Sequence, residues 1–115
     1  MGNAFILYGV GVFFEEKDSP LTEEDRDKLD TLWGRFDNSN EEVKKLWYVS
    51  DVDSGGNIFV GNVIARNELG YAIKIDSTLE EKARELIPHV QKQLKALGYK
   101  DLASKVEIYC YCGQD

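Results

Sequence analysis

The stretch that decides the fold is STLEEKARELIPHVQKQLKALG, residues 77–98. Ser77 and Glu80 predict a capping box at the start of a helix, and Gly98 predicts a left-handed C-cap at its end. Pro88 falls on the solvent side, so its missing hydrogen bond bends the helix without ending it. We therefore expect one bent helix of about six turns. Its apolar side, which faces a sheet, consists of residues spaced three and four apart: Leu79, Ala83, Leu86, Val90, Leu94 and Leu97.

A second helix is expected over residues 21–35, with Thr22 and Asp25 as its capping pair. Its buried side would consist of Leu29, Leu32, Trp33 and Phe36. Runs rich in β-branched and aromatic residues predict strands, and there are five of them: 4–15, 46–52, 58–66, 71–75 and 105–112.

The first of these strands is apolar on both faces, which predicts a position inside the sheet. Gly9 and Gly11 remove two side chains from one face, and they indicate a close approach or a bulge. Residues 41–45 predict one short helical turn, and 98–104 a connector.

The order of elements predicts an α+β fold, a two-layer sandwich. A mostly antiparallel sheet of about five strands would carry two helices on one face, in the order β-α-β-β-β-α-β. This order resembles the ferredoxin-like split β-α-β with one extra strand, and the similarity is one of element order only. The length of 115 residues predicts a single domain over residues 1–115.

The net charge of −7 belongs to the first half of the chain. Residues 1–57 hold 13 acidic and 6 basic side chains, whereas the remaining residues hold 8 of each. A nucleic-acid binder needs the opposite sign, so direct binding of DNA or RNA is not expected. The N-terminus has no signal-peptide pattern and no apolar run reaches the length of a membrane span, which predicts a cytoplasmic protein without membrane contact.

No catalytic constellation is visible, and we expect neither enzymatic activity, nor a cofactor, nor a metal site. Asp51 and Asp53 imitate the start of a calcium loop, but Asn62 stands where a bidentate Glu belongs. Cys110 and Cys112 point the same way in the last strand, where the spacing disfavours a disulfide. We expect these two thiols to be buried and unbridged.

Two functions from different classes remain. The first is a small acidic binding protein, an inhibitor or decoy of the nucleic-acid-mimic type, like the anti-CRISPR and anti-defence proteins of phages and mobile elements. It would dock on the basic surface of a partner that itself binds nucleic acid. The residues expected to contact that partner are Glu15, Glu16, Asp18, Glu23, Glu24, Asp27 and Asp30.

The alternative is a small-molecule or nucleotide-binding domain that uses the open face of the sheet. Its pocket would be lined by aromatic residues of the strands, namely Trp47, Tyr48, Phe59, Tyr71, Tyr109 and Tyr111. The sequence is compatible with a monomer and with a homodimer.

Overall fold

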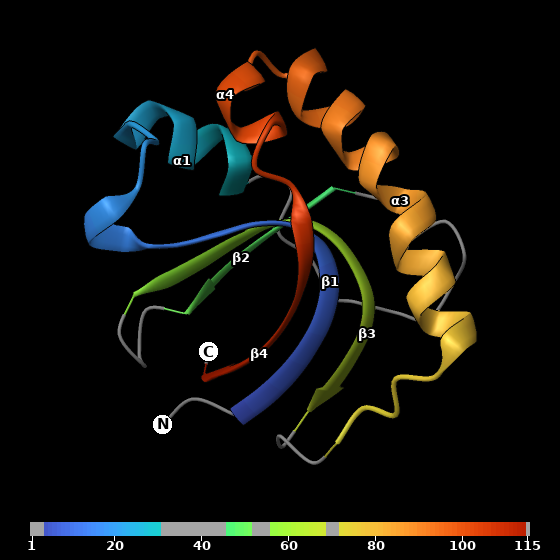
Figure 1. The fold of residues 1–115 in the computed structure, drawn as a ribbon. Coiled ribbons are helices and arrows are strands. Elements are labelled where there is room, and N and C mark those ends of the chain that lie inside the picture. Colours follow the sequence, from blue (N-terminus) through green and yellow to red (C-terminus); the bar gives the residue numbers. More distant parts are fainter. Residues whose placement is uncertain (1–3, 31–45, 52–55, 69–71, 115) are drawn as a thin grey trace.

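The computed structural model describes residues 4–30, 46–51, 56–68 and 72–114. Four strands form one antiparallel sheet in the order β2-β3-β1-β4 (Figure 1). The strands are β1 (Ala4–Glu15), β2 (Trp47–Asp51), β3 (Asn57–Glu68) and β4 (Glu107–Gln114). Because β3 lies between β1 and β2, the strand order is that of a split β-α-β. The α+β two-layer fold expected from the sequence is confirmed.

Helices α1 (Glu23–Asp30) and α3 (Ser77–Ala96) share one face of the sheet with the short helix α4 (Lys100–Ala103). A 3-10 turn, η1 (Glu16–Asp18), links β1 to the approach of α1. The described part of α1 ends at Asp30, so Leu32, Trp33 and Phe36 lie outside the described residues. The helical turn expected at 41–45 lies outside them, and so does Asp53 of the segment that imitates a calcium loop. None of the described helices has the length and apolar character needed to cross a bilayer.

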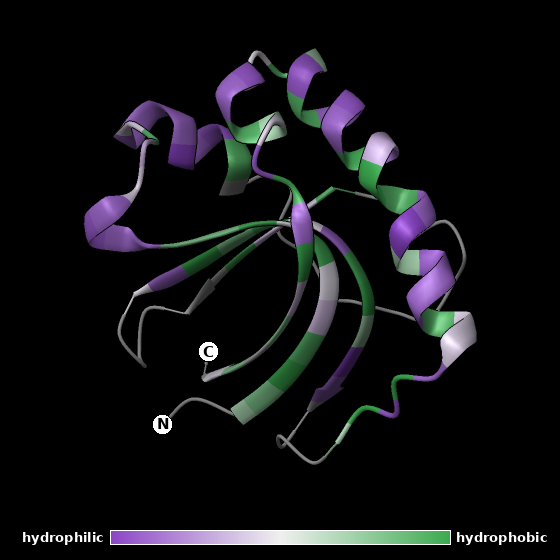
Figure 2. Cartoon of the chain, in the orientation of Figure 1, coloured by the Kyte–Doolittle hydropathy of each residue, from purple (hydrophilic) through white to green (hydrophobic). Residues whose placement is uncertain are grey.

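The apolar stripe of α3 packs on the sheet as predicted (Figure 2). Ala83, Leu86, Val90 and Leu94 are buried, and Leu79 and Leu97 are half-buried against the same core. Pro88 lies inside the helix, and Gly98 follows it with a φ of +92°. One detail of the prediction was wrong: the N-cap is Asp76, whose carboxylate accepts a hydrogen bond from the Leu79 N–H (2.9 Å).

Strand β1 lies inside the sheet and both of its faces are buried, as expected. Tyr8, Val10 and Val12 face the helices. The other face carries a second core of Phe5, Leu7, Trp47, Val49, Phe59 and Val63. The ladder with β3 shifts register next to Gly9, which is the irregularity that this glycine indicated.

The expected strand at 71–75 was wrong, and the described sheet therefore has four strands instead of five. Residues 72–76 lead to the cap of α3 without strand structure. The Asn67 side chain donates a hydrogen bond to the Ala72 carbonyl (2.8 Å), which ties the turn to β3. Ile73 packs on the core, whereas Ile75 is 45% exposed. One anchoring contact is enough to explain the apolar alternation without a strand partner.

Two further expectations need correction at the C-terminal end. The connector at 98–104 contains α4, and the last strand begins at Glu107 instead of Lys105. Cys110 and Cys112 are unbridged as expected, but both are exposed. The reason is that β4 is the outermost strand of the sheet, so no further strand shields its outer side.

Candidate acidic surface and adjoining cavity

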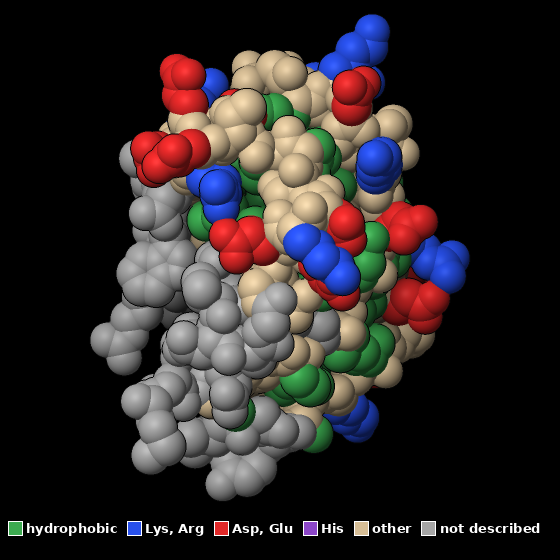
Figure 3. Space-filling model, turned by 90° about the vertical axis from the view of Figure 1, so that its left-hand side faces the viewer, with side chains coloured by type: hydrophobic (Ala, Val, Ile, Leu, Met, Phe, Trp, Pro, Cys, Tyr) green, Lys and Arg blue, Asp and Glu red, His purple; other side chains and the backbone are tan. Residues whose placement is uncertain are grey.

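The acidic residues singled out in the sequence follow β1 through η1 into α1. Figure 3 turns this side of the molecule toward the viewer and shows acidic side chains spread over it, with Lys and Arg among them. In Figure 2 the same elements, η1 and α1, are largely hydrophilic, in contrast to the strands. We use the name acidic surface for Glu15, Glu16, Asp18, Glu23, Glu24 and Asp27, all of which are exposed.

The start of α1 explains why its carboxylates point outward. The Thr22 N–H donates to the Asp25 carboxylate (3.0 Å), and the Asp25 N–H donates to the Thr22 hydroxyl (3.1 Å). This reciprocal pair is the capping box predicted for this helix. Leu29 is buried on the core side, which turns Glu23, Glu24 and Asp27 toward solvent.

Tyr99 fixes α1 against the connector between α3 and α4. Its hydroxyl donates to the Asp25 carboxylate (3.0 Å), and the Lys28 ammonium lies over its ring, 5.9 Å from the centroid. The hydrogen bond from the Thr22 N–H, followed by the one from Tyr99, holds the pKa of Asp25 below its ordinary value of 3.8. Asp25 therefore has a structural task, which Glu23, Glu24 and Asp27 do not share among the described residues.

The acidic residues differ in how far the chain neutralises them. Glu16 pairs with Arg26 (2.7 Å) and Glu15 with Lys17 (3.1 Å), both near the surface. Within the described residues, Asp18, Glu23, Glu24 and Asp27 form no ion pair or side-chain hydrogen bond. Asp30 ends the described part of α1, and the structure does not describe its side chain. The structure thus brings six of the seven expected contact residues into one exposed segment.

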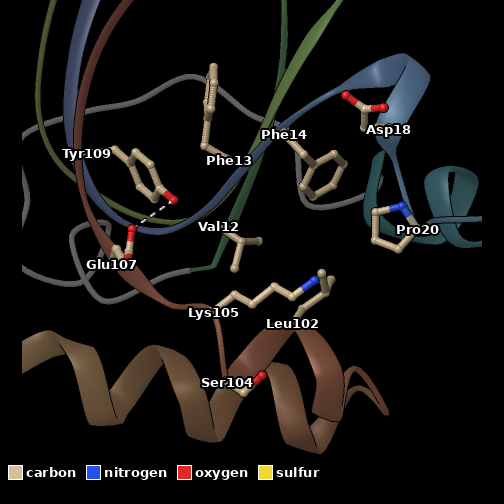
Figure 4. Close-up of a pocket in the computed structure, with 10 residues that line it drawn as sticks. All are labelled: Val12, Phe13, Phe14, Asp18, Pro20, Leu102, Ser104, Lys105, Glu107 and Tyr109. Carbon is tan, nitrogen blue, oxygen red and sulfur yellow. Dashed lines mark hydrogen bonds between the residues drawn. The ribbon is translucent and has the colours of Figure 1, made fainter.

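A cavity of about 400 Å³ opens beside this segment, and it was not predicted from the sequence. It forms where the ladder between β1 and β4 ends, at the pair Gly11–Glu107. Beyond that pair β1 continues toward η1, and the chain entering β4 comes from α4 (Figure 1). Figure 4 shows its lining, which comprises Val12, Phe13, Phe14, Asp18, Pro20, Leu102, Ser104, Lys105, Glu107 and Tyr109.

Aromatic rings form one wall of the cavity. The rings of Phe13 and Tyr109 lie 5.7 Å apart, and Tyr109 also meets Phe59 edge to face at 6.5 Å. The Tyr109 hydroxyl donates to the Glu107 carboxylate over a long distance of 3.3 Å. Burial, and after it the negative charge of Glu107, raises the pKa of Tyr109, so this hydroxyl stays protonated at neutral pH.

The lining of the cavity also includes three charged side chains. In Figure 4, Asp18 and Glu107 lie on opposite sides of the cavity, and the side chain of Lys105 extends along its lower edge toward Leu102. All three are exposed, and among the described residues no ion pair joins Lys105 to either carboxylate.

The aromatic residues proposed for a pocket on the sheet face are divided between its two faces: Trp47, Phe59 and Tyr109 lie on the face away from the helices, and Tyr48 lies on the helix face. Trp47, Tyr48 and Phe59 are buried, at 3%, 5% and 0% exposure. Tyr71 and the side chain of Tyr111 are outside the described part of the chain, and Tyr109 lines the cavity. Across the described ranges, no three His, Cys, Asp or Glu side chains are grouped so that they could hold a metal ion.

The chain matches no protein-family model, no curated protein and no solved structure.

Proposed function

We propose that this protein is a small acidic binding protein whose acidic surface docks on a basic surface of another macromolecule. It would act as an inhibitor or decoy that imitates a nucleic-acid backbone, in the manner of the anti-CRISPR and anti-defence proteins of phages and mobile elements. The partner would be a nucleic-acid-binding protein.

One observation carries the proposal. Within the described residues, Glu23, Glu24 and Asp27 form no ion pair, while Asp25 on the same helix caps it and Leu29 anchors it. The helix is thus built into the fold by other residues, and these three carboxylates are left for contact with a partner. A row of exposed negative charge steers a basic partner and raises the association rate.

The test reverses the charge of these three residues. The variant Glu23→Lys/Glu24→Lys/Asp27→Lys is compared with Glu81→Lys/Glu85→Lys/Asp101→Lys, which changes the net charge equally on α3 and α4. A partner captured by the wild type is measured at roughly 50 and 300 mM salt, where the Debye length falls from about 14 to 6 Å. We expect slower association for the α1 variant alone, a steep salt dependence for the wild type, and displacement of nucleic acid from the partner.

Equal behaviour of the two variants, together with salt-independent binding by the wild type, would contradict the proposal. Displacement is the more specific readout. A partner that binds the protein and its nucleic acid at the same time would exclude the decoy mechanism and leave only charge-driven docking.

A second candidate function follows from the cavity. A volume of about 400 Å³ is within the range of small-molecule sites, about 300–1,000 Å³, and the lining mixes rings with a few polar groups. The small-molecule alternative thus moves from the sheet face to the end of β1. Binding of a nucleotide such as ADP, weakened by Lys105→Gln, would favour it over the acidic decoy.

A further inference from the structure

We propose that the cavity at the end of β1 is a binding site for a guanidinium group, and that its occupant is an arginine side chain of the docking partner. This inference rests on the proposed function, because it names the group by which a basic partner would be anchored next to the acidic surface. The site is defined by the residues shown in Figure 4.

The charge of the lining favours a cation. Asp18 and Glu107 contribute two carboxylates and Lys105 one ammonium group. The lining therefore has an excess of one negative charge, and the whole protein carries a net charge of −7. An anionic ligand would have to approach through this negative surface, whereas a cation would be attracted to it.

The residues that line the cavity also indicate which kind of cation it would bind. Phe13 and Tyr109 offer aromatic surfaces on the face of the sheet away from the helices, where Glu107 lies beside Tyr109, and Phe14 lies on the helix face (Figure 4). A guanidinium is planar, stacks on aromatic rings, and donates up to five hydrogen bonds to carboxylates. A lysine ammonium is more strongly hydrated and cannot stack in the same way, so arginine fits these walls better.

Lys105 makes the inference unusually easy to test. Its ammonium is the positive charge in the lining of the cavity, and among the described residues it forms no ion pair, so it would repel an incoming guanidinium. Removal of this charge should therefore strengthen the binding of a cation and weaken the binding of an anion. The sign of one substitution separates the two classes of ligand.

The probe is Nα-acetyl-arginine amide, whose only charge is the guanidinium, titrated into the full chain and followed by amide chemical shifts. The matched probes are Nα-acetyl-citrulline amide, a neutral isostere, and Nα-acetyl-lysine amide. We expect millimolar binding with shifts confined to residues 12–20 and 102–109. The arginine probe should bind at least about fivefold more tightly than either matched probe, since citrulline lacks the charge of the guanidinium and lysine lacks its planar stacking surface.

Three variants complete the experiment. Asp18→Asn/Glu107→Gln should weaken the arginine probe at least about fivefold, and Lys105→Gln should tighten it about two- to fivefold. Glu81→Gln/Glu85→Gln, which removes two charges from the exposed side of α3, should change its affinity by less than about twofold at 150 mM salt. If the double cavity variant does not fold, Lys105→Gln alone still decides the sign.

Shifts spread over other surfaces, equal binding of citrulline, or weaker arginine binding by Lys105→Gln would each overturn the assignment. Binding of ADP or inorganic phosphate that depends on Lys105 would overturn it in favour of an anion site. These outcomes do not depend on the docking partner. Failure of the probe removes the cavity assignment alone, and equal partner binding by the α1 and α3/α4 reversal variants removes the proposed function alone.

Discussion

Gly11 and Gly61 lie opposite each other in the ladder between β1 and β3. The backbone of the facing strand leaves no room for a side chain at either position. A Cβ atom on either glycine would collide with backbone atoms of the facing strand, including the Val60 or the Val10 carbonyl. Backbone of a central ladder cannot move aside as the end of a flexible side chain can. The two strands approach this closely only because both positions are glycine.

We predict that Gly11→Ala and Gly61→Ala each lower the free energy of unfolding by about 1–3 kcal/mol, the usual cost of overpacking. The measurement is the urea midpoint at constant m-value. Gly98→Ala separates sterics from backbone conformation, because Gly98 has a φ of +92° and no atoms near its Cβ position. It should cost about 1–2 kcal/mol from conformation alone. Gly98→Asn should cost less. Neutral behaviour of both ladder variants would contradict the close approach.

Cys110 and Cys112 show where residue-level reasoning from sequence failed. Their spacing indicates a strand with both thiols on one side, and the structure agrees on the strand and on the absence of a bridge. Their burial was predicted from residue type alone, since cysteine is often buried. The sequence did not say that β4 is at the edge of the sheet. Burial, and after it the neighbouring Cys112 thiol, still raises the pKa of Cys110.

At the scale of the element, the start of α3 distinguishes two neighbouring residues that both fit a capping pattern. Asp76 accepts the Leu79 N–H, whereas Ser77 is the first residue of the helix. We predict that Asp76→Ala lowers the free energy of unfolding by about 0.5–2 kcal/mol, the cost of losing an N-cap. Ser77→Ala should change it by less than about 0.5 kcal/mol. The opposite order of the two effects in urea titrations would restore Ser77 as the cap.

The start of α1 should respond to acid through Asp25. Its pKa is lower in the folded protein than the ordinary value of 3.8, so its stabilising effect is complete above pH 3.8 and disappears as the pH falls through the lower, folded-state pKa. We predict that Asp25→Asn is less stable than the wild type by a constant amount between pH 5 and 7. The difference should shrink below about pH 3.8, measured by thermal melts at each pH. A difference that grows on acidification would contradict this sign.

The periodic spacing of apolar residues correctly predicted the helix and the strand that pack against a large apolar surface. The stripe of α3 and the two apolar faces of β1 repeat at the helix and strand periods, and both are buried as expected. The alternation of residues 71–75 misled because one buried residue, Ile73, produces the same pattern as a paired strand. An alternating apolar pattern shows which side chains are buried. It does not show whether the backbone pairs with a neighbouring strand.

The cavity was invisible for a related reason. Its walls come from the end of β1, from η1, from α4 and from the start of β4, which are distant in sequence. Only the register of the β1–β4 ladder determines that β4 stops opposite Gly11 and leaves space beyond it. The acidic surface could be predicted because its residues are neighbours in sequence.

At the scale of the whole molecule, the residues that stabilise the fold are different from the charged residues proposed for docking. Glu23, Glu24 and Asp27 contact neither apolar core. We predict that reversing all three to Lys changes the free energy of unfolding by less than about 1 kcal/mol. The loss of favourable charge at the helix N-terminus, about 0.3–1 kcal/mol per residue, is offset by relief of repulsion among like charges. A urea titration measures this, and a larger loss would mean that these residues support the fold.

The pairing of β1 with β4 also has a consequence for the time at which the protein can complete its sheet. Ala4 pairs with Gln114, so the central strand β1 receives its second neighbour only after β4, about 90 residues later, has been made. At roughly 5–20 residues per second, the ribosome needs several seconds to pass from β1 to β4. During this interval the nascent chain holds β1, apolar on both faces, with one long edge open. Completion of the sheet thus depends on the pairing of β1 with β4, which are far apart in sequence. Until that pairing forms, chaperones can bind the exposed edge of β1.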